Sequence, residues 1–189
     1  MNYKIDFSFI SALEGGQLLK AYVPASSISQ SGVTVATGFD LGARDQADLQ
    51  RLNFPPDLIA RLKPYLGLKK ADAVKKLDQQ PLTISQQDAD IIDKAAKTDA
   101  TDFIVNLYDS AIAPDKFKFA ALSAEAQTVI ASVSYQYGDL SRRTPMFWAA
   151  ITDQDWEKSI DILKDFHDNY PTRRNKEAAY LQAVLSPSH

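Results

Sequence analysis

The chain contains no cysteine, and its 189 residues include only two histidines, His167 and His189. Without cysteine, the protein can form neither a disulfide framework nor a thiolate metal site. Two histidines also leave few nitrogen ligands for zinc. We therefore expect a protein that works without a metal or any other cofactor.

The sequence also lacks an excess of basic charge. Lys and Arg total 21 against 24 Asp and Glu, which gives a formal net charge of −3 and a pI near 5.4. Non-specific binding to nucleic acid depends on a positive field, so nucleic acid is not an expected partner.

Long apolar runs are absent as well. No window approaches the roughly 18 apolar residues of a membrane span, so no span is expected. The segment Met1–Asp6 is not followed by an apolar stretch of signal-peptide length. We expect synthesis in the cytoplasm without a cleaved signal, and delivery to any outside site by another route.

The hydrophobic content of 45% is ample for a folded core. Short β-prone pieces occupy residues 17–41, and helical patterns follow to the end of the chain. The sequence predicts an α+β fold: one domain over 1–189, with a small antiparallel ribbon and a mostly helical, two-lobed body. The small lobe is expected at about 15–80, and the helical lobe at about 85–189 together with the N-terminal helix.

The longest predicted helix begins at Ser85, where Ser85-Gln86-Gln87-Asp88 has the form of a capping box, and extends to about Ser110. One stripe of this helix is expected to face the core. The residues of that stripe are Ile92, Ala96, Phe103, Leu107 and Ala111.

Two acidic residues stand out because each lies beside glycine where regular structure is expected to end. Glu14 precedes Gly15-Gly16 after the first helix, and Asp40 precedes Gly42 after the ribbon. Paired carboxylates across a groove suit glycoside hydrolysis, which uses one acid to protonate the leaving oxygen and a second group to stabilise the sugar or activate water. The alternatives are a helix-terminal surface charge for Glu14 and a turn residue bonded to its own backbone for Asp40.

The motif set around these acids resembles that of the pesticin-type muramidases, a branch of the phage lysozyme superfamily. In that family a Glu ends the first helix, a Thr lies on the ribbon, and an Asp follows six positions after the Thr. Glu14, Thr34 and Asp40 match this pattern, and no other acid lies between Glu14 and Asp40. Thr37 is a nearby alternative to Thr34, but the six-residue spacing favours Thr34.

The resemblance implies a lysozyme-like fold and catalytic roles for three residues. Glu14 would protonate the glycosidic oxygen, Asp40 would supply the second carboxylate, and the Thr34 hydroxyl would order water. Tyr22, on the ribbon, is a candidate for stacking on a sugar. The sequence departs from the family at Ala36, where the ribbon commonly has glycine, and its acidic pI differs from the basic charge of many wall hydrolases.

The second half of the chain resembles the pesticin-type muramidases less specifically. Gln136, before Gly138, is expected either to bind a sugar or to form a helix-cap contact. Arg174, or its neighbour Arg173, is expected either to orient Glu14 and bind substrate or to form an exposed helical pair with Glu177. Phe147, Trp148 and Trp156 lie on apolar stripes and are expected in the core rather than as platforms for sugar stacking.

The resemblance implies a monomeric muramidase that cleaves the β-1,4 bond between N-acetylmuramic acid and N-acetylglucosamine in peptidoglycan. Such a protein would be an antibacterial effector or a phage lysin acting in the periplasm or cell wall of a target or host bacterium. An effector would also have an immunity protein as partner. Two alternatives stay open: a non-catalytic wall-binding module with the same fold, and a lytic transglycosylase.

Overall fold

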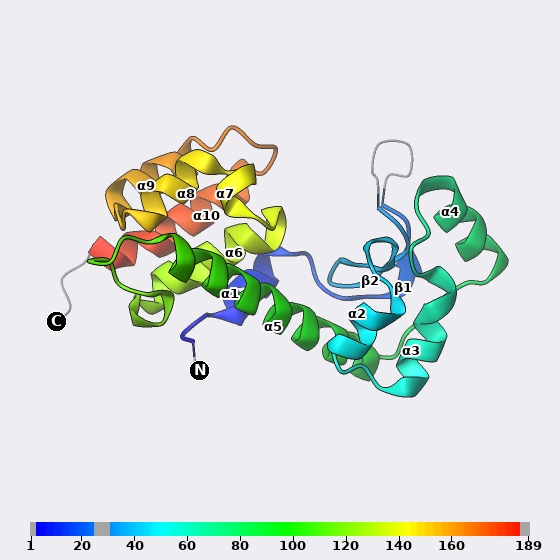
Figure 1. The fold of residues 1–189 in the computed structure, drawn as a ribbon. Helices are drawn as coiled ribbons and strands as arrows, with labels where there is room; N and C mark the ends of the chain where they lie inside the picture. Colours follow the sequence, from blue (N-terminus) through cyan, green and yellow to red (C-terminus); the bar gives the residue numbers. More distant parts are fainter. Residues whose placement is uncertain (1–2, 25–30, 186–189) are drawn as a thin grey trace. The chain divides into compact units, whose positions relative to one another are not determined.

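The computed structural model of the protein describes residues 3–24 and 31–185 (Figure 1). The chain forms two compact units: unit 1 comprises Met1–Leu13 and Ala100–His189, and unit 2 comprises Glu14–Asp99. The N-terminal helix thus belongs to the same unit as the C-terminal helices. The boundary near residue 99 lies inside a helix, whereas the sequence placed the change of lobe at about 80–85.

Unit 2 is built on a three-stranded antiparallel sheet in the order β1-β2-β3. Its strands are β1 (Leu18–Tyr22), β2 (Thr34–Ala36) and β3 (Phe39–Asp40). The predicted ribbon is therefore present, with Asp40 as the last residue of a third, very short strand. A turn over residues 36–38 joins β2 to β3, and Gly38 takes a φ of +89° there, a backbone conformation that glycine adopts without steric cost.

Short helices pack around this sheet. They are η1 (Leu41–Ala43), α2 (Gln46–Arg51), α3 (Pro56–Leu62), η2 (Lys63–Tyr65) and α4 (Lys70–Gln79). Asp45 caps α2 through a capping box with Asp48, and Pro56 opens α3. Apolar residues of the sheet and these helices share one core, with Val33, Val35 and Leu41 fully buried.

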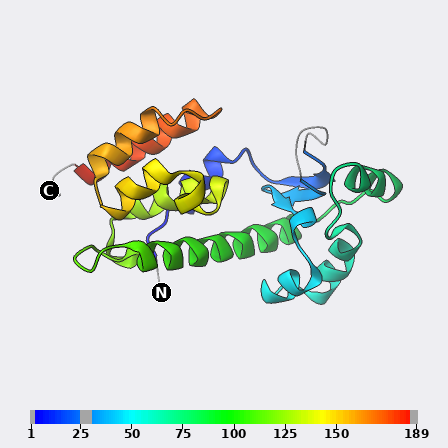
Figure 2. The ribbon, with the colours of Figure 1, turned by 45° about the horizontal axis from the view of Figure 1, so that its top comes forward.

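The long helix α5 (Gln86–Ala111) contributes to both units (Figure 2). Its capping box is confirmed: the Ser85 amide donates to Asp88, and the Asp88 amide donates to the Ser85 hydroxyl. The predicted stripe is wrong in part, because Phe103 is 47% exposed and Ala111 is exposed. Ile92 packs in the core of unit 2 and Ile104 in that of unit 1. One stripe fails because two separate cores bury the two halves of the helix.

Unit 1 is helical throughout the part that the structure describes. Its elements are α1 (Phe7–Leu13), the second half of α5, η3 (Phe119–Ala121), α6 (Ala124–Tyr137), α7 (Leu140–Arg143), α8 (Pro145–Thr152), α9 (Trp156–Lys164), α10 (Pro171–Leu181) and η4 (Gln182–Leu185). Helix α6 is buried along residues 126–134 and has Gly138 as its C-cap. Helix α10 packs against α6 and α9.

The aromatic residues expected in the core of unit 1 lie there. Phe147 is 1% exposed, and Trp148 and Trp156 are partly buried against the same apolar cluster. Helix α9 begins at Trp156, with Asp155 as its N-cap. The protein has the α+β architecture that the sequence predicted: mostly helical, with one small antiparallel sheet.

Candidate active site

The sheet of unit 2 aligns three of the predicted site residues. Tyr22 of β1 lies opposite Thr34 of β2, and Thr34 lies opposite Asp40 of β3. Side chains directly opposite each other on antiparallel strands project from the same face of the sheet. Tyr22, Thr34 and Asp40 therefore form one row across the sheet, which we call the sheet row.

Thr34 is at the centre of the sheet row and is only 2% exposed. Its hydroxyl donates to the carbonyl oxygen of Gly32 at 3.2 Å. A hydroxyl that has used its single donor retains acceptor lone pairs. Thr34 can therefore accept a hydrogen bond from a water molecule or a substrate hydroxyl.

Asp40 is held by two backbone amides. Its Oδ1 atom accepts from the amide of Gly32 at 2.9 Å and from that of Gly42 at 2.8 Å, and the residue is the N-cap of η1. The turn contact expected as the alternative for Asp40 is thus present, and it uses one oxygen. The Oδ2 atom accepts no hydrogen bond from residues 3–24 or 31–185. The same carboxyl group can serve the fold through Oδ1 and a substrate through Oδ2.

Both amides that hold Asp40 belong to glycines because the backbones of the two residues touch. A Cβ added to Gly32 would lie 2.2 Å from the Leu68 carbonyl oxygen and 2.5 Å from the Gly42 Cα. A Cβ added to Gly42 would meet the same carbonyl oxygen at 2.5 Å and the Gly32 Cα at 2.7 Å. No side chain fits at either position unless backbone moves, so these glycines are what allow one oxygen to reach two amides.

Asp93 of α5 anchors the turn at the end of the sheet. Its Oδ1 accepts from the Thr37 amide at 3.1 Å, and its Oδ2 accepts from the Thr37 hydroxyl at 2.6 Å and from Gln17 Nε2 at 2.8 Å. Thr37, the alternative to Thr34, therefore donates both its amide and its hydroxyl hydrogen to Asp93. No short-range sequence pattern predicted this contact, because Asp93 is 56 residues from Thr37.

Ala36, the departure from the family ribbon, has a backbone conformation that glycine favours. It takes a φ of +51° and is 1% exposed. A residue with a Cβ is strained in this left-handed region by about 1–2 kcal/mol. Glycine would adopt this conformation without that strain, whereas the residue here is alanine.

Glu14 lies outside the sheet row, on the segment between α1 and β1. It directly follows the last residue of α1, and Gly15 and Gly16 take φ values of +82° and +89°. Positive φ values at two successive glycines end the helix and turn the chain toward the sheet. The Oε2 atom of Glu14 is buried.

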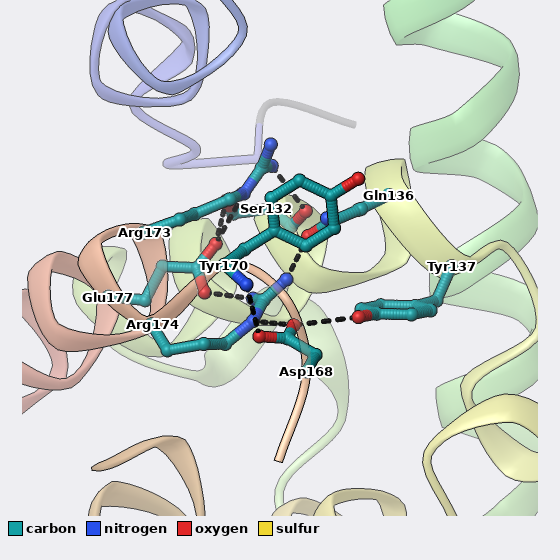
Figure 3. A network of polar contacts seen from close by, with 8 residues as sticks. All are labelled: Ser132, Gln136, Tyr137, Asp168, Tyr170, Arg173, Arg174 and Glu177. Atoms are coloured by element: carbon teal, nitrogen blue, oxygen red, sulfur yellow. Dashed lines mark hydrogen bonds and ion pairs between the residues drawn. The ribbon is translucent and has the colours of Figure 1, made fainter. Parts of the chain in front are cut away.

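Gln136 and Arg174, the remaining predicted site residues, lie together in unit 1 (Figure 3). Arg174 is 1% exposed and uses three nitrogens: Nε donates to Asp168 at 2.9 Å, Nη1 donates to Glu177, and Nη2 donates to the Gln136 Oε1 atom. The guanidinium lies 4.7 Å from the ring centroid of Phe166 and 5.4 Å from that of Tyr137. Arg174 thus contacts residues of its own unit through every part of the guanidinium.

Glu177 is shared by two arginines. It is fully buried and accepts from Arg173 Nε at 3.1 Å, from the Ser132 hydroxyl at 2.5 Å and from Arg174. The helical pairing of Glu177 with Arg173 and Arg174 was among the alternatives read from the sequence, but the expectation that the pair is exposed is wrong. The pair is buried because α10 packs against α6 and α9.

Asp168 completes this cluster and was not predicted from the sequence. Burial raises its pKa, but hydrogen bonds from Tyr137 and Arg174 outweigh burial, and the net pKa lies below the usual value. Burial, followed by the Asp168 hydrogen bond, raises the pKa of Tyr137. We call Ser132, Gln136, Tyr137, Asp168, Arg173, Arg174 and Glu177 the arginine network.

Comparison with known families shows to which family this chain belongs. A model of the family Pesticin, described as "Bacterial toxin homologue of phage lysozyme, C-term", matches residues 4–157. The chain belongs to the pesticin family. The resemblance inferred from Glu14, Thr34 and Asp40 is therefore confirmed at the level of the family, and a search of curated proteins finds no match.

The pesticin match separates the candidate residues into two groups. Glu14, Tyr22, Thr34, Asp40 and Gln136 lie within residues 4–157. The network residues Asp168, Arg173, Arg174 and Glu177 lie beyond the matched range. Among the residues that the structure describes, no helix is long and apolar enough to span a membrane, and no three metal-binding side chains are grouped as a metal site requires.

Proposed function

We propose that this pesticin-family protein is a muramidase that cleaves the β-1,4 bond between N-acetylmuramic acid and N-acetylglucosamine in peptidoglycan. Membership of a lysozyme-homologous toxin family supports this proposal. The observation that carries it is the pairing of Thr34 with Asp40, whose Oδ2 atom has no hydrogen bond from the described residues.

In the proposed reaction Glu14 is the general acid and gives its proton to the glycosidic oxygen as the bond to the anomeric carbon breaks. Asp40 is the second carboxylate, which stabilises the positive charge on the sugar or activates the water that replaces the leaving group. Thr34 accepts a hydrogen bond from that water. Tyr22, in the same row, offers a ring on which a sugar can stack.

The direct test follows clearance of purified peptidoglycan by turbidity, with wild type and Glu14→Gln. The variant should be slower by at least about 100-fold, the usual contribution of a general acid. Glu157→Gln is the matched control, because Glu157 is an exposed glutamate in the first turn of α9, and it should retain wild-type clearance. Equal clearing by wild type and Glu14→Gln, or no clearing by wild type, contradicts the proposal.

Asp40→Asn tests the two uses of the second carboxyl group. The amide oxygen can still accept from Gly32 and Gly42, so the free energy of unfolding should change by less than about 1 kcal/mol. The negative charge is lost, so clearance should fall by at least about 100-fold. Asp72→Asn, at an exposed residue in the first turn of α4, is the control. Activity that survives Asp40→Asn would point to a reaction with one acid, as in a lytic transglycosylase.

The products distinguish hydrolysis from transglycosylation. Mass spectrometry of digested muropeptides should show reducing N-acetylmuramic acid ends, which have gained the elements of water. Anhydro ends would assign the protein to the transglycosylases.

We further propose that the protein is an antibacterial toxin that reaches the wall of a target bacterium and has an immunity protein as partner. Membership of a family described as a bacterial toxin homologue of phage lysozyme supports this role. Expression with an added periplasmic export signal should lyse a susceptible host, whereas the same chain without it should not. Lysis that does not require export would contradict action at the wall.

A further inference from the structure

The carboxylate of Asp93 joins two segments of unit 2 that are distant in sequence. Thr37 donates its amide to Oδ1 at 3.1 Å and its hydroxyl to Oδ2 at 2.6 Å, and Gln17 Nε2 donates to the same Oδ2 at 2.8 Å. Asp93 is only 9% exposed. All three groups that it meets are donors, and a carboxylate is the side chain that offers acceptors alone. The position therefore suits a carboxylate and not an amide.

The two segments lead directly to the proposed catalytic acids. Gln17 lies three residues after Glu14, and Thr37 lies three residues before Asp40. Between Glu14 and Gln17 the chain has only Gly15 and Gly16, and an added Cβ at either glycine would meet no atom within 4 Å. Gln17 is thus a point of attachment that follows a loosely surrounded pair of glycines. Asp93 connects this point with the turn that precedes Asp40.

The side chain of Gln17 is held by one face of α5. Its Nε2 group donates to Asp90 at 3.0 Å as well as to Asp93, and its Oε1 atom accepts from Gln86 Nε2. Residues 86, 90 and 93 follow the i, i+4, i+7 spacing of a single helical face. Because both ends of the Gln17 amide have partners on this face, its orientation is fixed.

Helix α5 is itself attached to the sheet of unit 2. The Ala21 amide of β1 donates to the Leu82 carbonyl oxygen at 2.9 Å, and the Ile84 amide donates to the Leu19 carbonyl oxygen at 2.9 Å. These contacts lie just before the first residue of α5, and Asp93 lies about two turns further along the helix. The helix therefore provides a rigid element against which Asp93 can hold the turn after β2.

The turn that Asp93 holds contains strained backbone. Ala36 takes a φ of +51° and Gly38 a φ of +89°, on either side of Thr37. A non-glycine residue stays in this conformation only where the surrounding structure fixes it. The two hydrogen bonds from Thr37 to Asp93 provide such fixation at the centre of the turn.

We propose that Asp93 is a positioning residue for the cleavage reaction: it holds the segments before and after the ribbon on α5 and so sets the separation of the Glu14 and Asp40 carboxyl groups. Asp93 does not touch the substrate in this role. The inference rests on the proposed function for the roles of Glu14 and Asp40, and all of these residues belong to unit 2. The separation of two catalytic carboxyl groups governs how a glycosidase reacts, so a shift should act on the rate of cleavage rather than on binding.

Asp93→Asn is the decisive variant. Asparagine has one acceptor oxygen where aspartate has two, so its Nδ2 group must face a donor of Thr37 or of Gln17. With a soluble hexasaccharide of alternating N-acetylglucosamine and N-acetylmuramic acid, assayed well below the melting temperature, kcat should fall about 10- to 100-fold, with KM unchanged. Asp102→Asn, at an exposed residue of the same helix, is the control and should retain wild-type kcat. An unchanged kcat for Asp93→Asn, or a loss that appears only in KM, would overturn the inference.

A second experiment asks whether Thr37 acts through Asp93. Thr37→Val removes the hydroxyl donor and should lower kcat about three- to tenfold, whereas Thr37→Ser keeps the donor and should restore the rate. In an Asp93→Ala background Thr37→Val should have no further effect, because the hydroxyl has already lost its partner. A further loss in that background would give Thr37 a separate role and overturn the inference. If Asp93→Ala does not fold, Asp93→Asn still decides.

Binding separates a positioning role from damage to the whole site. The Kd for the same hexasaccharide is measured by calorimetry in a Glu14→Gln background, which prevents cleavage, with and without Asp93→Asn. The two values should agree, and a Kd that rises as far as kcat falls would overturn the inference. If wild type and Asp93→Asn hydrolyse peptidoglycan equally, this inference alone fails. A wild-type protein that does not hydrolyse peptidoglycan defeats the proposed function as well.

Discussion

The sheet row of unit 2 and the arginine network of unit 1 hold their polar groups in opposite ways. Asp40 is fixed by the backbone amides of Gly32 and Gly42, which lie eight and two residues from it in sequence. Arg174 is fixed by the side chains of Asp168, Glu177 and Gln136, of which Gln136 is 38 residues away. The first depends on how closely two backbones approach, and the second on balanced buried charge.

This difference predicts which substitutions each region tolerates. A carboxyl group that is held by backbone amides keeps its hydrogen bonds when its charge is removed. It does not keep them when a Cβ is added nearby. A network of buried ions tolerates a change of side-chain shape that costs less than about one hydrogen bond. It does not tolerate the loss of one charge. Four further changes break or sharpen this contrast.

The largest effect is expected for Glu177→Gln in the arginine network. The substitution leaves Arg173 and Arg174 buried around a neutral amide, and loss of one partner of a buried ion pair costs about 3–5 kcal/mol. Urea unfolding followed by tryptophan fluorescence measures this cost in unit 1, where both Trp148 and Trp156 lie. Glu157→Gln on the surface is the control and should stay within about 0.5 kcal/mol. A loss below 1 kcal/mol would mean that the charge of Glu177 is dispensable.

Gly32→Ala should have the next largest effect, in the sheet row. The new Cβ would lie 2.2 Å from the Leu68 carbonyl oxygen, and overpacking of this kind costs about 1–3 kcal/mol or more. Hydrogen exchange of the amides of β2 and β3 measures the loss locally. Gly67→Ala is the control: it has a φ of +71° and open space around it, so it should cost only the backbone strain of about 1 kcal/mol. Equal effects at the two glycines would contradict the close approach at Gly32.

Asp88→Asn removes the charge from the partly exposed ion pair of Arg61 and Asp88, for comparison with the buried ion pairs of Arg174. Two hydrogen bonds from Arg61, each 2.8 Å long, hold the pKa of Asp88 well below its usual range, although burial opposes them. Because the folded pKa is below the unfolded pKa of about 3.9, the stabilisation is present above about pH 4 and is lost as the pH falls further. The difference in unfolding free energy between wild type and variant should be about 1–2 kcal/mol at pH 6, the order of a hydrogen bond to a charged group, and should shrink toward pH 2. A difference that is constant over this range would show that Asp88 contributes without its charge.

The smallest effect is expected for Ala36→Gly, at the last residue of β2. Relief of the left-handed backbone at a φ of +51° is worth about 1–2 kcal/mol. Loss of a buried methyl group costs about 0.8 kcal/mol, and the flexibility of glycine in the unfolded chain costs a further 0.5–1 kcal/mol. The net change should be under about 1 kcal/mol by thermal unfolding, with clearance of peptidoglycan unchanged. A loss of several kcal/mol would mean that the methyl group packs more tightly than its burial implies.

Features that arise over a few residues are encoded by the neighbouring sequence. The spacing of Thr34 and Asp40 places them opposite each other because a tight turn at 36–38 pairs residues six apart. The caps at Ser85 and Asp45, the end of α6 at Gly138 and the family itself are also local in origin. Each depends on backbone geometry or on hydrogen bonds within one turn, which the neighbouring residues specify.

Only the tertiary structure decided which side chains from distant segments meet. The spacing of Arg174 and Glu177 predicted that they pair, but their burial depends on α6 and α9. The contacts of Asp93 with Thr37 and of Asp168 with Arg174 depend on packing that no periodic pattern in the sequence predicts. The two halves of α5 likewise took their buried faces from two separate cores. Such contacts depend on where whole helices pack, and this is a property of the folded chain rather than of any short stretch of it.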